Sequence, residues 1–363
     1  MLIIWLSVSM VLKKIKYQGF RNLVDAELEF TDDFNFIIGK NGTGKTNLLE
    51  AIFYAGLGSS FRVREEEHMI RIGESFLRVA AETENISAAV FYDGHKKKLT
   101  LQGNEVRRLS NYVGWLGLVI LSIEDIWMVR GGPSHRRSFM DWTIAKISAV
   151  YLSNLIEYRR ILRQRNSILQ NGDKNNYEVL QLFNEQLIKT GNEIYRERAA
   201  FLPKLKDSIT VFGNELGLQK LTLGYRSTCP DMHINEKVLN RIRSRELIIG
   251  HTLVGPHRDD LIFSIKDRPL KDYASEGEER AGVISMKLAE AEILYRETGQ
   301  RPILILDEVG AELDRDKIKI LLGLLKGQIF YASTQLPGFS QGGGQKNRYF
   351  TIERGSIEVS PEN

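Results

Sequence analysis

Eight consecutive residues of this chain have the types and spacing of a loop that binds phosphate. The pattern is G-x-x-x-x-G-K-[ST], and its members are Gly39, Lys40, Asn41, Gly42, Thr43, Gly44, Lys45 and Thr46. Glycines at these positions let the backbone wrap a polyphosphate, with several N–H groups directed at it from a helix N-terminus. Lys45 is then expected to reach the β- and γ-phosphates, and the Thr46 hydroxyl to bind Mg²⁺. The alternative is a glycine-rich turn that fits the pattern by chance.

A second candidate for chemistry lies far along the chain, where four apolar residues, 303–306, precede Asp307 and Glu308. Carboxylates at the end of a buried strand suit a nucleotide site. The first can act as an outer ligand of Mg²⁺, and the second as the general base that positions the attacking water. The alternative is a buried strand whose acidic end merely reaches solvent. Beside the phosphate loop, the pair favours hydrolysis of a nucleoside triphosphate.

Hydrophobic patterning predicts the elements that position these residues. The apolar runs 34–38 and 302–306 are typical of buried strands, and 47–52 has helical spacing directly after the phosphate loop. Alternating patterns with turn residues between them predict a meander of antiparallel strands. The further strands are expected at 12–17, 24–30, 77–81, 87–92, 98–101, 113–121, 261–265 and 328–332.

A change in pattern near residue 130 predicts a helical lobe inserted into the nucleotide-binding part. Helical spacing runs from 135 to about 169, a second helix ends near 200, and a third segment spans 202–216. Strong helices are also expected at 279–296 and about 316–325. The predicted domains are therefore 1–129 with 246–363, which carry the nucleotide site, and an inserted lobe at 130–245.

The totals are those of a globular protein with a sizeable core. The chain has 363 residues, of which 42% are hydrophobic and 26% charged, and its net charge is +4. A single cysteine, Cys229, excludes an internal disulfide and any cysteine-rich zinc site, which suits a reducing cytosol. The apolar start, 1–12, is too short to span a bilayer, and Met10 would also serve as an initiator. We therefore expect a cytoplasmic protein without a targeting segment.

Several further stretches resemble known ATPases. Ser275 to Arg280 opens the helix before Asp307, where ABC-type ATPases carry their signature motif, and 310–314 is similar to their D-loop. The turn 19–22 resembles one in the heads of SMC and Rad50 proteins. Three features resemble the RecF family of bacterial recombination mediators in particular. They are 122–125 followed by 131–137, the stretch 252–260 with its Gly-Pro-His-Arg-Asp-Asp core, and the overall length.

This resemblance implies a P-loop ABC-type ATPase head of Rad50-like α/β fold, with an antiparallel β meander and an inserted α-helical lobe. It also implies ATP and Mg²⁺ as cofactors, with ATP sandwiched between two protomers of an ATP-dependent homodimer. Besides the phosphate loop, the residues beside the nucleotide would be Arg21, Asn22, Asn47 and Arg62. The residues that act on the partner's nucleotide would be Ser275, Gly277, Glu278 and Asp314. The metal site would combine Thr46, Asp307 and Glu124, with Lys45 and Glu308 as catalytic residues.

The cellular role implied by the resemblance is DNA repair, recombination and replication, including the SOS response. The protein would bind gapped DNA at single-strand/double-strand junctions and, with RecR and RecO, help load RecA. Candidate DNA contacts are the basic residues Arg136, Arg137, Arg159, Arg160 and Arg163. Phosphate neutralisation needs several such side chains on one surface, whereas a charge run is usually a solvated face. His251 and His257 have no carboxylate or cysteine at ligand spacing, so no metal site is expected there.

The chain departs from the general ATPase pattern in three places. Glu276 and Glu278 bring negative charge to the signature, which opposes a phosphate at that helix end. Ser333 stands in the region where a switch histidine is usual, and Glu124 stands where a Q-loop glutamine is expected. Slow hydrolysis is consistent with the last two departures, and DNA stimulation of that hydrolysis is what the resemblance to the RecF family implies. The same two departures also disfavour a rival interpretation as a nucleotide-binding subunit of an ABC transporter, while the short helices disfavour a structural SMC-type tether.

Overall fold

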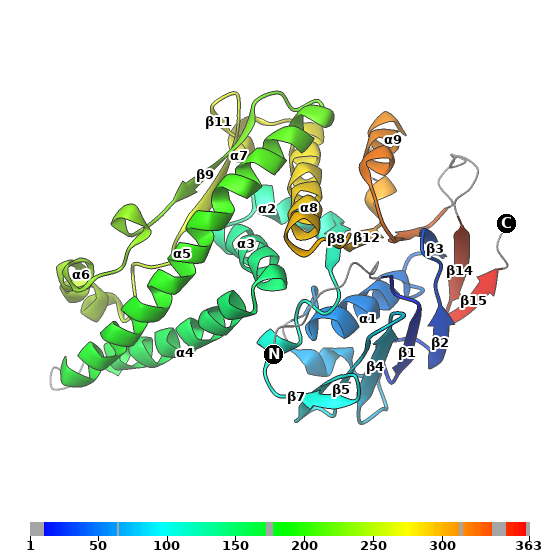
Figure 1. The fold of residues 1–363 in the computed structure, drawn as a ribbon, viewed down its shortest axis with the longest axis horizontal. Helices are drawn as coiled ribbons and strands as arrows, with labels where there is room; N and C mark the ends of the chain where they lie inside the picture. Colours follow the sequence, from blue (N-terminus) through cyan, green and yellow to red (C-terminus); the bar gives the residue numbers. More distant parts are fainter. Residues whose placement is uncertain (1–10, 64, 172–176, 312–314, 336–345, 361–363) are drawn as a thin grey trace. The chain divides into compact units, whose positions relative to one another are not determined.

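The computed structural model describes residues 11–63, 65–171, 177–311, 315–335 and 346–360 (Figure 1). The chain divides into two compact units: unit 1 is Met1–Asp125 with Met286–Asn363, and unit 2 is Ile126–Ser285. The predicted second initiator, Met10, and the predicted D-loop residue Asp314 lie outside the described residues.

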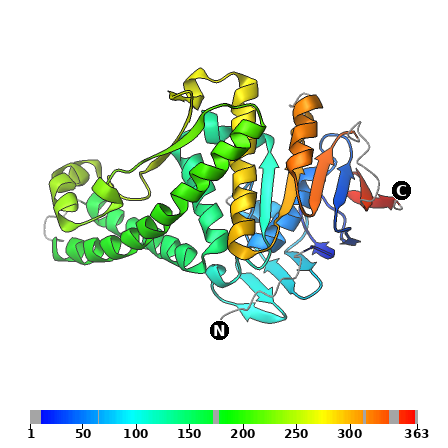
Figure 2. The same ribbon diagram turned by 45° about the horizontal axis from the view of Figure 1, so that its top comes forward.

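Unit 1 contains a six-stranded sheet in the order β15-β14-β3-β13-β12-β8 (Figure 2). Its strands are β3 (Phe34–Ile38), β8 (Leu118–Ser122), β12 (Ile303–Asp307), β13 (Ile329–Ser333), β14 (Asn347–Glu353) and β15 (Ser356–Ser360). All neighbours are parallel except the β14–β15 hairpin. The predicted strands at 34–38, 302–306 and 328–332 are confirmed, because buried parallel strands are continuous apolar runs. The predicted strand at 113–121 is too long, since β8 begins only at Leu118.

The other sheet of unit 1 is the predicted antiparallel meander, in the order β2-β1-β4-β5-β6-β7. Its strands are β1 (Lys14–Gln18), β2 (Ala26–Glu29), β4 (Leu77–Glu82), β5 (Ser87–Tyr92), β6 (Lys97–Leu101) and β7 (Asn104–Val106). In β4 buried and less buried residues alternate, as expected for a sheet with one solvated face.

Helix α1 (Lys45–Leu57) lies between these two sheets. It contacts β4 and β5 of the meander and β12 and β13 of the parallel sheet. Nearly all of its side chains are therefore buried, including Lys45 and Glu50. A helix covered by a sheet on each side has no solvent stripe, which is why residues 48–57 are apolar on every side of the helix apart from Glu50.

A buried glutamine connects the two sheets of unit 1. Gln328 is 3% exposed and stands immediately before β13. Its side chain accepts a hydrogen bond from the Leu12 N–H at 2.9 Å and donates to the carbonyls of Leu12 at 2.8 Å and Thr31 at 2.7 Å. These bonds satisfy backbone groups that would otherwise be buried without partners. The segments before β1 and after β2 are thereby fixed to the parallel sheet.

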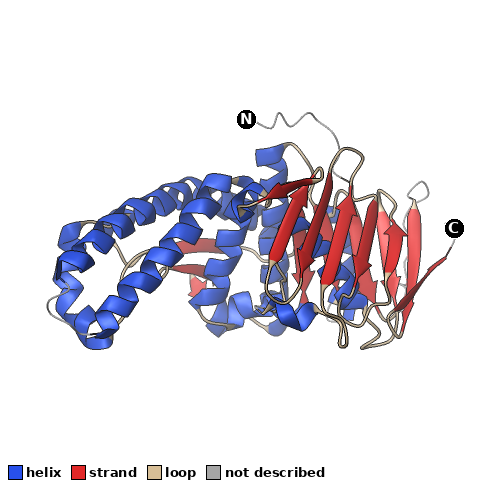
Figure 3. Cartoon of the chain, turned by 90° about the horizontal axis from the view of Figure 1, so that it is seen from below, coloured by secondary structure: helices blue, strands red, loops and turns tan. Residues whose placement is uncertain are grey.

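Unit 2 is mainly helical (Figure 3). Its helices are α2 (Trp127–Arg130), α3 (Pro133–Ile147), α4 (Ala149–Asn171), α5 (Tyr177–Glu215), α6 (Glu236–Ile249) and α7 (Leu270–Tyr273). The helix predicted from 135 to about 169 is interrupted at Ser148, whose hydroxyl accepts a hydrogen bond from the Tyr151 N–H and so begins α4. Conversely, the predicted break near 201 is wrong, because α5 continues through Pro203.

Unit 2 also contains a small antiparallel sheet that the sequence did not reveal. Its order is β11-β10-β9, with β9 (Leu221–Arg226), β10 (Asp260–Ile265) and β11 (Arg268–Pro269). Since β10 pairs with β9, residues 246–285 belong to unit 2, whereas the predicted inserted lobe ends at 245. The strand expected at 261–265 exists, but it is not part of the nucleotide-binding sheet.

Two helices follow the small sheet. Helix α8 (Glu276–Thr298) begins in unit 2 and ends in unit 1, and α9 (Arg315–Leu324) belongs to unit 1. Both match helices expected from the sequence. Among the described residues, no helix combines the length and the apolar character needed to cross a membrane.

Candidate functional site

The phosphate loop joins β3 to α1, the context that its sequence pattern requires. Gly44 has φ 121°, and a Cβ atom there would lie 3.0 Å from Leu23 Cδ2 and 3.1 Å from Asn22 Oδ1. Only glycine fits this backbone and this close approach. The loop is closed by Thr43, whose hydroxyl donates to the Lys40 carbonyl at 2.9 Å.

The Lys45 ammonium group lies inside this loop. It donates to the carbonyls of Gly39 at 2.8 Å and Lys40 at 3.0 Å, and the side chain is 3% exposed. Its Nζ atom also lies 3.2 Å from Glu308 Oε1. The first residue of α1 is thus a buried cation that links the loop to the acidic end of β12.

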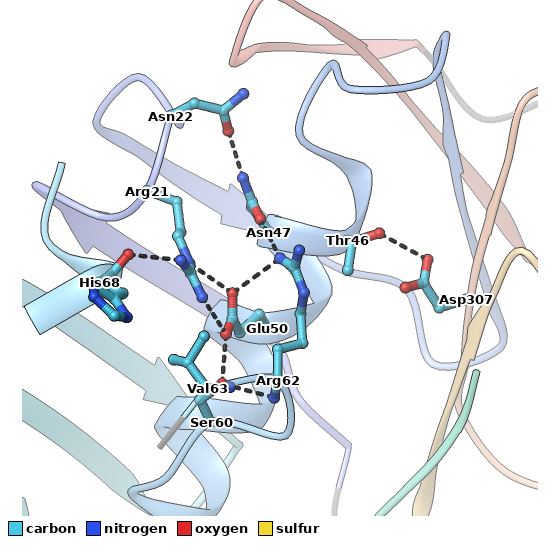
Figure 4. Close-up of polar contacts among 10 residues, drawn as sticks. All are labelled: Arg21, Asn22, Thr46, Asn47, Glu50, Ser60, Arg62, Val63, His68 and Asp307. Atoms are coloured by element: carbon cyan, nitrogen blue, oxygen red, sulfur yellow. Dashed lines mark hydrogen bonds and ion pairs between the residues drawn. The ribbon is translucent and has the colours of Figure 1, made fainter. Parts of the chain in front are cut away.

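Thr46 and Asp307 form the second link between loop and sheet (Figure 4). The Thr46 hydroxyl donates to Asp307 Oδ1 at 3.1 Å. Burial raises the pKa of Asp307 to about 6, and the neighbouring Glu308 charge acts in the same direction, while the Thr46 hydrogen bond opposes it. A buried carboxylate next to a hydroxyl is a suitable donor pair for a hard divalent cation, whose charge would offset the cost of burial.

Glu308 has an unusual backbone. Its φ is 55°, in the left-handed region that few residues other than glycine adopt. The Glu308 N–H donates to the Ala332 carbonyl of β13 at 3.0 Å, which holds the turn against the sheet. Strain of this kind is found at functional sites when the surroundings fix it. Here it accompanies a carboxylate that meets the Lys45 ammonium.

A buried carboxylate that the sequence did not single out, Glu50, organises the side of the loop. Arg21 donates to both of its oxygens, each at 2.9 Å, and the Ser60 hydroxyl donates to Oε1 (Figure 4). Arg62 Nη1 lies 3.4 Å from Oε2. Glu50 is wholly buried, so its charge requires these partners. A glutamate among apolar residues of a buried helix was the available signal.

The four residues expected beside the nucleotide are connected through the first turns of α1. Asn47 donates from Nδ2 to Asn22 Oδ1 at 2.7 Å and accepts from Arg62 Nη1 at 2.8 Å (Figure 4). Arg21 joins the same network through Glu50 and also donates to the His68 carbonyl at 2.6 Å. The structure therefore brings Arg21, Asn22, Asn47 and Arg62 together beside the phosphate loop.

Glu124 follows β8 at the same edge of the sheet as Asp307. Ser122, the last residue of β8, is the register partner of Asp307 on β12. The Glu124 side chain is exposed. Its neighbour Asp125 is more firmly placed, because it accepts from the Ser122 N–H at 2.7 Å and lies 3.1 Å from Lys287 Nζ. The metal role expected for Glu124 is thus not visible as a contact and stays a prediction.

The predicted signature residues lie at the start of α8 in unit 2, where they form a capping box. The N–H and hydroxyl of Ser275 donate to Glu278 Oε2 at 2.8 Å and 2.9 Å, and the Ser275 carbonyl accepts from the Glu278 and Glu279 N–H groups. Gly277 lies in the first turn. The Ser275 hydroxyl would have to leave the Glu278 carboxylate to contact a phosphate.

The five arginines predicted to contact DNA differ in how exposed they are. Arg136 is buried, and its guanidinium donates to Asp260 at 2.8 Å and 3.1 Å and to the Gly131 carbonyl at 2.9 Å. The expectation that Arg136 faces DNA is therefore wrong, because this side chain forms an internal ion pair. Arg137 is half-buried and donates to the Asp259 carbonyl.

The three arginines of α4 are accessible. Arg159 lies 3.3 Å from Asp141 Oδ2 and its side chain is 56% exposed. Arg160 is bonded to Glu157 on the same helix face, at 2.9 Å and 2.6 Å. Arg163 is exposed. Of the five predicted arginines, these three have the accessibility that contact with DNA requires.

The Gly-Pro-His-Arg-Asp-Asp stretch is structural in unit 2. Asp259 accepts from the Tyr225 hydroxyl at 2.6 Å and from Thr228 at 2.8 Å. His257 Nδ1 lies 2.8 Å from the Tyr158 hydroxyl and Nε2 lies 3.2 Å from the Thr252 carbonyl, so the ring is a neutral tautomer protonated on Nε2. Burial lowers the pKa of His257 to about 4.

Two buried arginines, Arg198 and Arg165, complete this network. Arg198 donates to Asp141 at 2.7 Å and to the Pro256 carbonyl at 2.8 Å, and Arg165 donates to Glu246 at 2.6 Å. Within the described ranges, no group of three or more histidine, cysteine, aspartate or glutamate residues could hold a metal ion. A Mg²⁺ ion at Thr46 and Asp307 would therefore depend on phosphate oxygens and water, as Mg²⁺ usually does.

The two sheets around a buried phosphate-loop helix, with carboxylates at the end of the neighbouring strand, define an ABC-type ATPase head of the SMC class. Residues 11–113 match the family model described as RecF/RecN/SMC N terminal domain. A solved SMC head bound to the C-terminal winged-helix domain of ScpA is 15% identical, covers 96% of this chain and 97% of that chain, and has a TM-score of 0.56, which supports the fold.

More specific similarity covers nearly the whole chain. The DNA replication and repair protein RecF of Shouchella clausii is 33% identical over 96% of this chain and 99% of its own length. The Bacillus cereus protein of the same name is 32% identical over 96% and 98%. A solved structure of RecF with ATP is 31% identical, with a TM-score of 0.86 over 97% of this chain and 98% of that chain. This chain belongs to the RecF family.

Proposed function

We propose that this chain is an ATPase whose nucleotide state controls its binding to DNA during recombinational repair. The observation that carries the proposal is the arrangement at the edge of the parallel sheet. Thr46 lies 3.1 Å from Asp307, and Lys45 lies 3.2 Å from Glu308. A hydroxyl–carboxylate pair and a cation–carboxylate pair beside a phosphate loop are the groups that hydrolysis of ATP requires. The solved RecF structure with ATP supports the same ligand here.

Each side chain has a defined task in this proposal. The loop N–H groups and Lys45 bind and orient the phosphates, and Lys45 exchanges its two carbonyl partners for phosphate oxygens. Mg²⁺, held by Thr46 and Asp307, would neutralise charge on the β- and γ-phosphates. Glu308 orients a water molecule and accepts its proton. Arg21, Asn22, Asn47 and Arg62 line the side of the nucleotide, positioned by the buried Glu50.

The proposal includes an ATP-dependent homodimer in which α8 of one protomer meets the nucleotide of the other. A helix N-terminus with a hydroxyl suits a γ-phosphate. The Ser275 hydroxyl already donates a hydrogen bond to the Glu278 carboxylate at 2.9 Å. The phosphate must therefore displace a negatively charged group. We therefore expect weak nucleotide-driven dimerisation and slow hydrolysis.

In the cell, this ATPase would recognise gapped DNA and act with RecR and RecO in loading RecA. The relatives named DNA replication and repair protein RecF support this role. A solved neighbour, described as the recombination mediator protein RecF in the RecFOR pathway, supports it as well. The exposed arginines of α4, Arg159, Arg160 and Arg163, are the proposed phosphate contacts.

The test is ATP turnover measured with and without gapped DNA, together with the molecular mass in ATP and Mg²⁺. The proposal predicts slow turnover that gapped DNA accelerates and a mass that doubles with ATP. Turnover without any DNA response would contradict the role in repair. A mass that stays monomeric with ATP, with and without DNA, would contradict the nucleotide sandwich.

A further inference from the structure

Helix α6 of unit 2 carries a row of basic side chains that the proposed function has not used. Lys237, Arg241 and Arg245 are all exposed and follow one another at four-residue intervals. Residues four apart lie on neighbouring turns of one helix face. At 1.5 Å per residue the row is about 12 Å long. We call these three residues the α6 stripe.

The α6 stripe differs from several other basic residues on the helices of this chain. None of its three side chains has a hydrogen bond or ion pair with another described residue. Elsewhere, four helix arginines are paired with a glutamate three or four positions away. The pairs are Arg160–Glu157, Arg196–Glu193, Arg280–Glu276 and Arg296–Glu292. Those four arginines are neutralised by a glutamate on their own helix, and the three side chains of the α6 stripe are not.

The arrangement also opposes the stability of the helix. Lys237 and Arg241, and again Arg241 and Arg245, are like charges at i and i+4, which repel each other on a helix surface. Lys237 is the second residue of α6, where the helix dipole disfavours a cation. All three positions therefore cost stability when no anion is near, and a polyanion along the stripe would relieve every one of these costs.

The helix that carries the stripe is firmly anchored. Its N-cap, Asn235, accepts a hydrogen bond from the Val238 N–H at 3.0 Å. Near its end, the wholly buried Glu246 accepts from Arg165 of α4 at 2.6 Å and from the Leu253 N–H at 2.8 Å. Since Glu246 is neutralised inside the unit, its charge does not balance the stripe. The stripe therefore lies on a helix that is fixed within unit 2, where α6 contacts α4 and α5 (Figure 1).

We propose that the α6 stripe binds the phosphate backbone of a nucleic acid. The inference rests on the DNA binding proposed above and adds a surface to it, separate from the arginines of α4. One strand of a duplex carries a phosphate every 3.4 Å or so along its axis, so about 12 Å faces three or four phosphates. Three cations match that number. The stripe has no base-reading geometry, so the contact is independent of sequence.

The apolar end of α6 does not favour a membrane instead. Leu247, Ile248 and Ile249 are exposed, Ile248 by 85%. They are consecutive, however, so their side chains point about 100° apart around the helix, and they do not form the continuous apolar face of a membrane-surface helix. A backbone of regularly spaced phosphates is the partner that the row of charges fits.

The test replaces Lys237, Arg241 and Arg245 together with Ala in the full chain. A matched control replaces three other exposed lysines of unit 2, Lys204, Lys206 and Lys271, and so removes the same charge. A second variant keeps the positive charge at all three positions by exchanging lysine and arginine: Lys237→Arg, Arg241→Lys and Arg245→Lys. Binding of fluorescent duplex and gapped DNA is measured by anisotropy between about 50 and 200 mM salt, and thermal midpoints are recorded in the absence of DNA.

For duplex DNA, each lost phosphate contact should lower the slope of log affinity against log salt by about 0.9, so the Ala variant should lose about 2.7. Between about 50 and 200 mM salt, the wild type should then lose roughly 40-fold more affinity than the Ala variant. The control and the charge-keeping variant should retain the wild-type slope. The thermal midpoint of the Ala variant should not fall, because repulsion is removed; this excludes misfolding as the cause.

Three outcomes separate the inference from the function on which it rests. A wild type that binds no DNA overturns the proposed function and the inference with it. A wild type that binds DNA, with an Ala variant of unchanged slope, overturns the α6 stripe alone. If the Ala variant instead loses binding to anionic vesicles while its DNA slope is unchanged, the stripe belongs to a membrane, and the inference is likewise refuted.

Discussion

Replacing Asp307 by asparagine should stabilise the protein without nucleotide and remove the part of its stabilisation by ATP that depends on Mg²⁺. A pKa of about 6, against an ordinary 3.8, means that the folded chain disfavours the charged form of this carboxyl. Each pKa unit corresponds to about 1.4 kcal/mol, so the buried charge costs about 3 kcal/mol at neutral pH. The asparagine side chain would keep an oxygen that accepts from Thr46, so the gain is not offset by a lost hydrogen bond.

The raised pKa of Asp307 also determines how the stability difference between Asp307→Asn and wild type changes with pH. A carboxyl whose pKa is raised on folding binds more protons in the native state between about pH 4 and pH 6. Its contribution to stability therefore falls as the pH rises through that window and is constant above it. The advantage of Asp307→Asn over wild type should be absent at about pH 4, grow up to about pH 6, and reach about 3 kcal/mol at about pH 7.5.

The assay is thermal unfolding followed at several pH values, with and without ATP and Mg²⁺. A gain of about 3 kcal/mol corresponds to roughly 6–12 °C for a unit of this size. Saturating ligand, at about 100 times its Kd, should stabilise wild type by about 2.7 kcal/mol, and the variant should lose the part that depends on Mg²⁺. Glu353→Gln, at an exposed position of β14, is the control and should change neither quantity. An Asp307→Asn protein that melts below wild type above the window, or an advantage that is equal below and above it, would refute the reasoning.

Three further substitutions test the remaining parts of the site. Lys45→Ala should weaken ATP binding by about 3 kcal/mol or more, because a cation directed at the phosphates is lost; unchanged affinity in a nucleotide titration would remove Lys45 from the site. Glu308→Gln should bind ATP normally but hydrolyse it more slowly by about 10² or more, because only the base is lost. Single-turnover rates equal to wild type would exclude Glu308 as the base. Ser275→Arg should leave the ATP affinity of the monomer intact and prevent the ATP-dependent dimer, as judged by sedimentation. A variant that still dimerises at wild-type nucleotide concentrations would contradict a role across the interface.

The central site could be predicted because its signals are local in sequence. A phosphate loop needs eight consecutive residues, and the strands that flank it are short apolar runs whose type follows from composition alone. The ends of β3 and β12 were accordingly predicted to within a residue, and with them Lys45, Thr46, Asp307 and Glu308.

Features that depend on distant partners could not be predicted in the same way. Glu50 is 29 residues from Arg21, and Arg198 is 57 residues from Asp141, so no spacing rule relates the members of either pair. Arg136 was assigned to DNA because it stands next to Arg137 in a basic cluster, and several cations on one surface suit phosphate contacts. Its partner, Asp260, lies 124 residues further along the chain, and the two side chains form a buried ion pair.

The bonds of Gln328 have a consequence for the synthesis of the protein. This side chain and its partner Leu12 are 316 positions apart, and β3 likewise pairs with β13 and β14 near the far end of the chain. At about 5–20 residues per second, a ribosome needs roughly 15–60 s to cover such an interval. During that time β3 lacks both of its partner strands, β13 and β14. Unit 2 is a single continuous segment, so all of it is synthesised before those strands. A nascent chain with an unpaired apolar strand is prone to aggregate. We therefore expect chaperones to bind the nascent chain at unit 1 while the protein is still being synthesised.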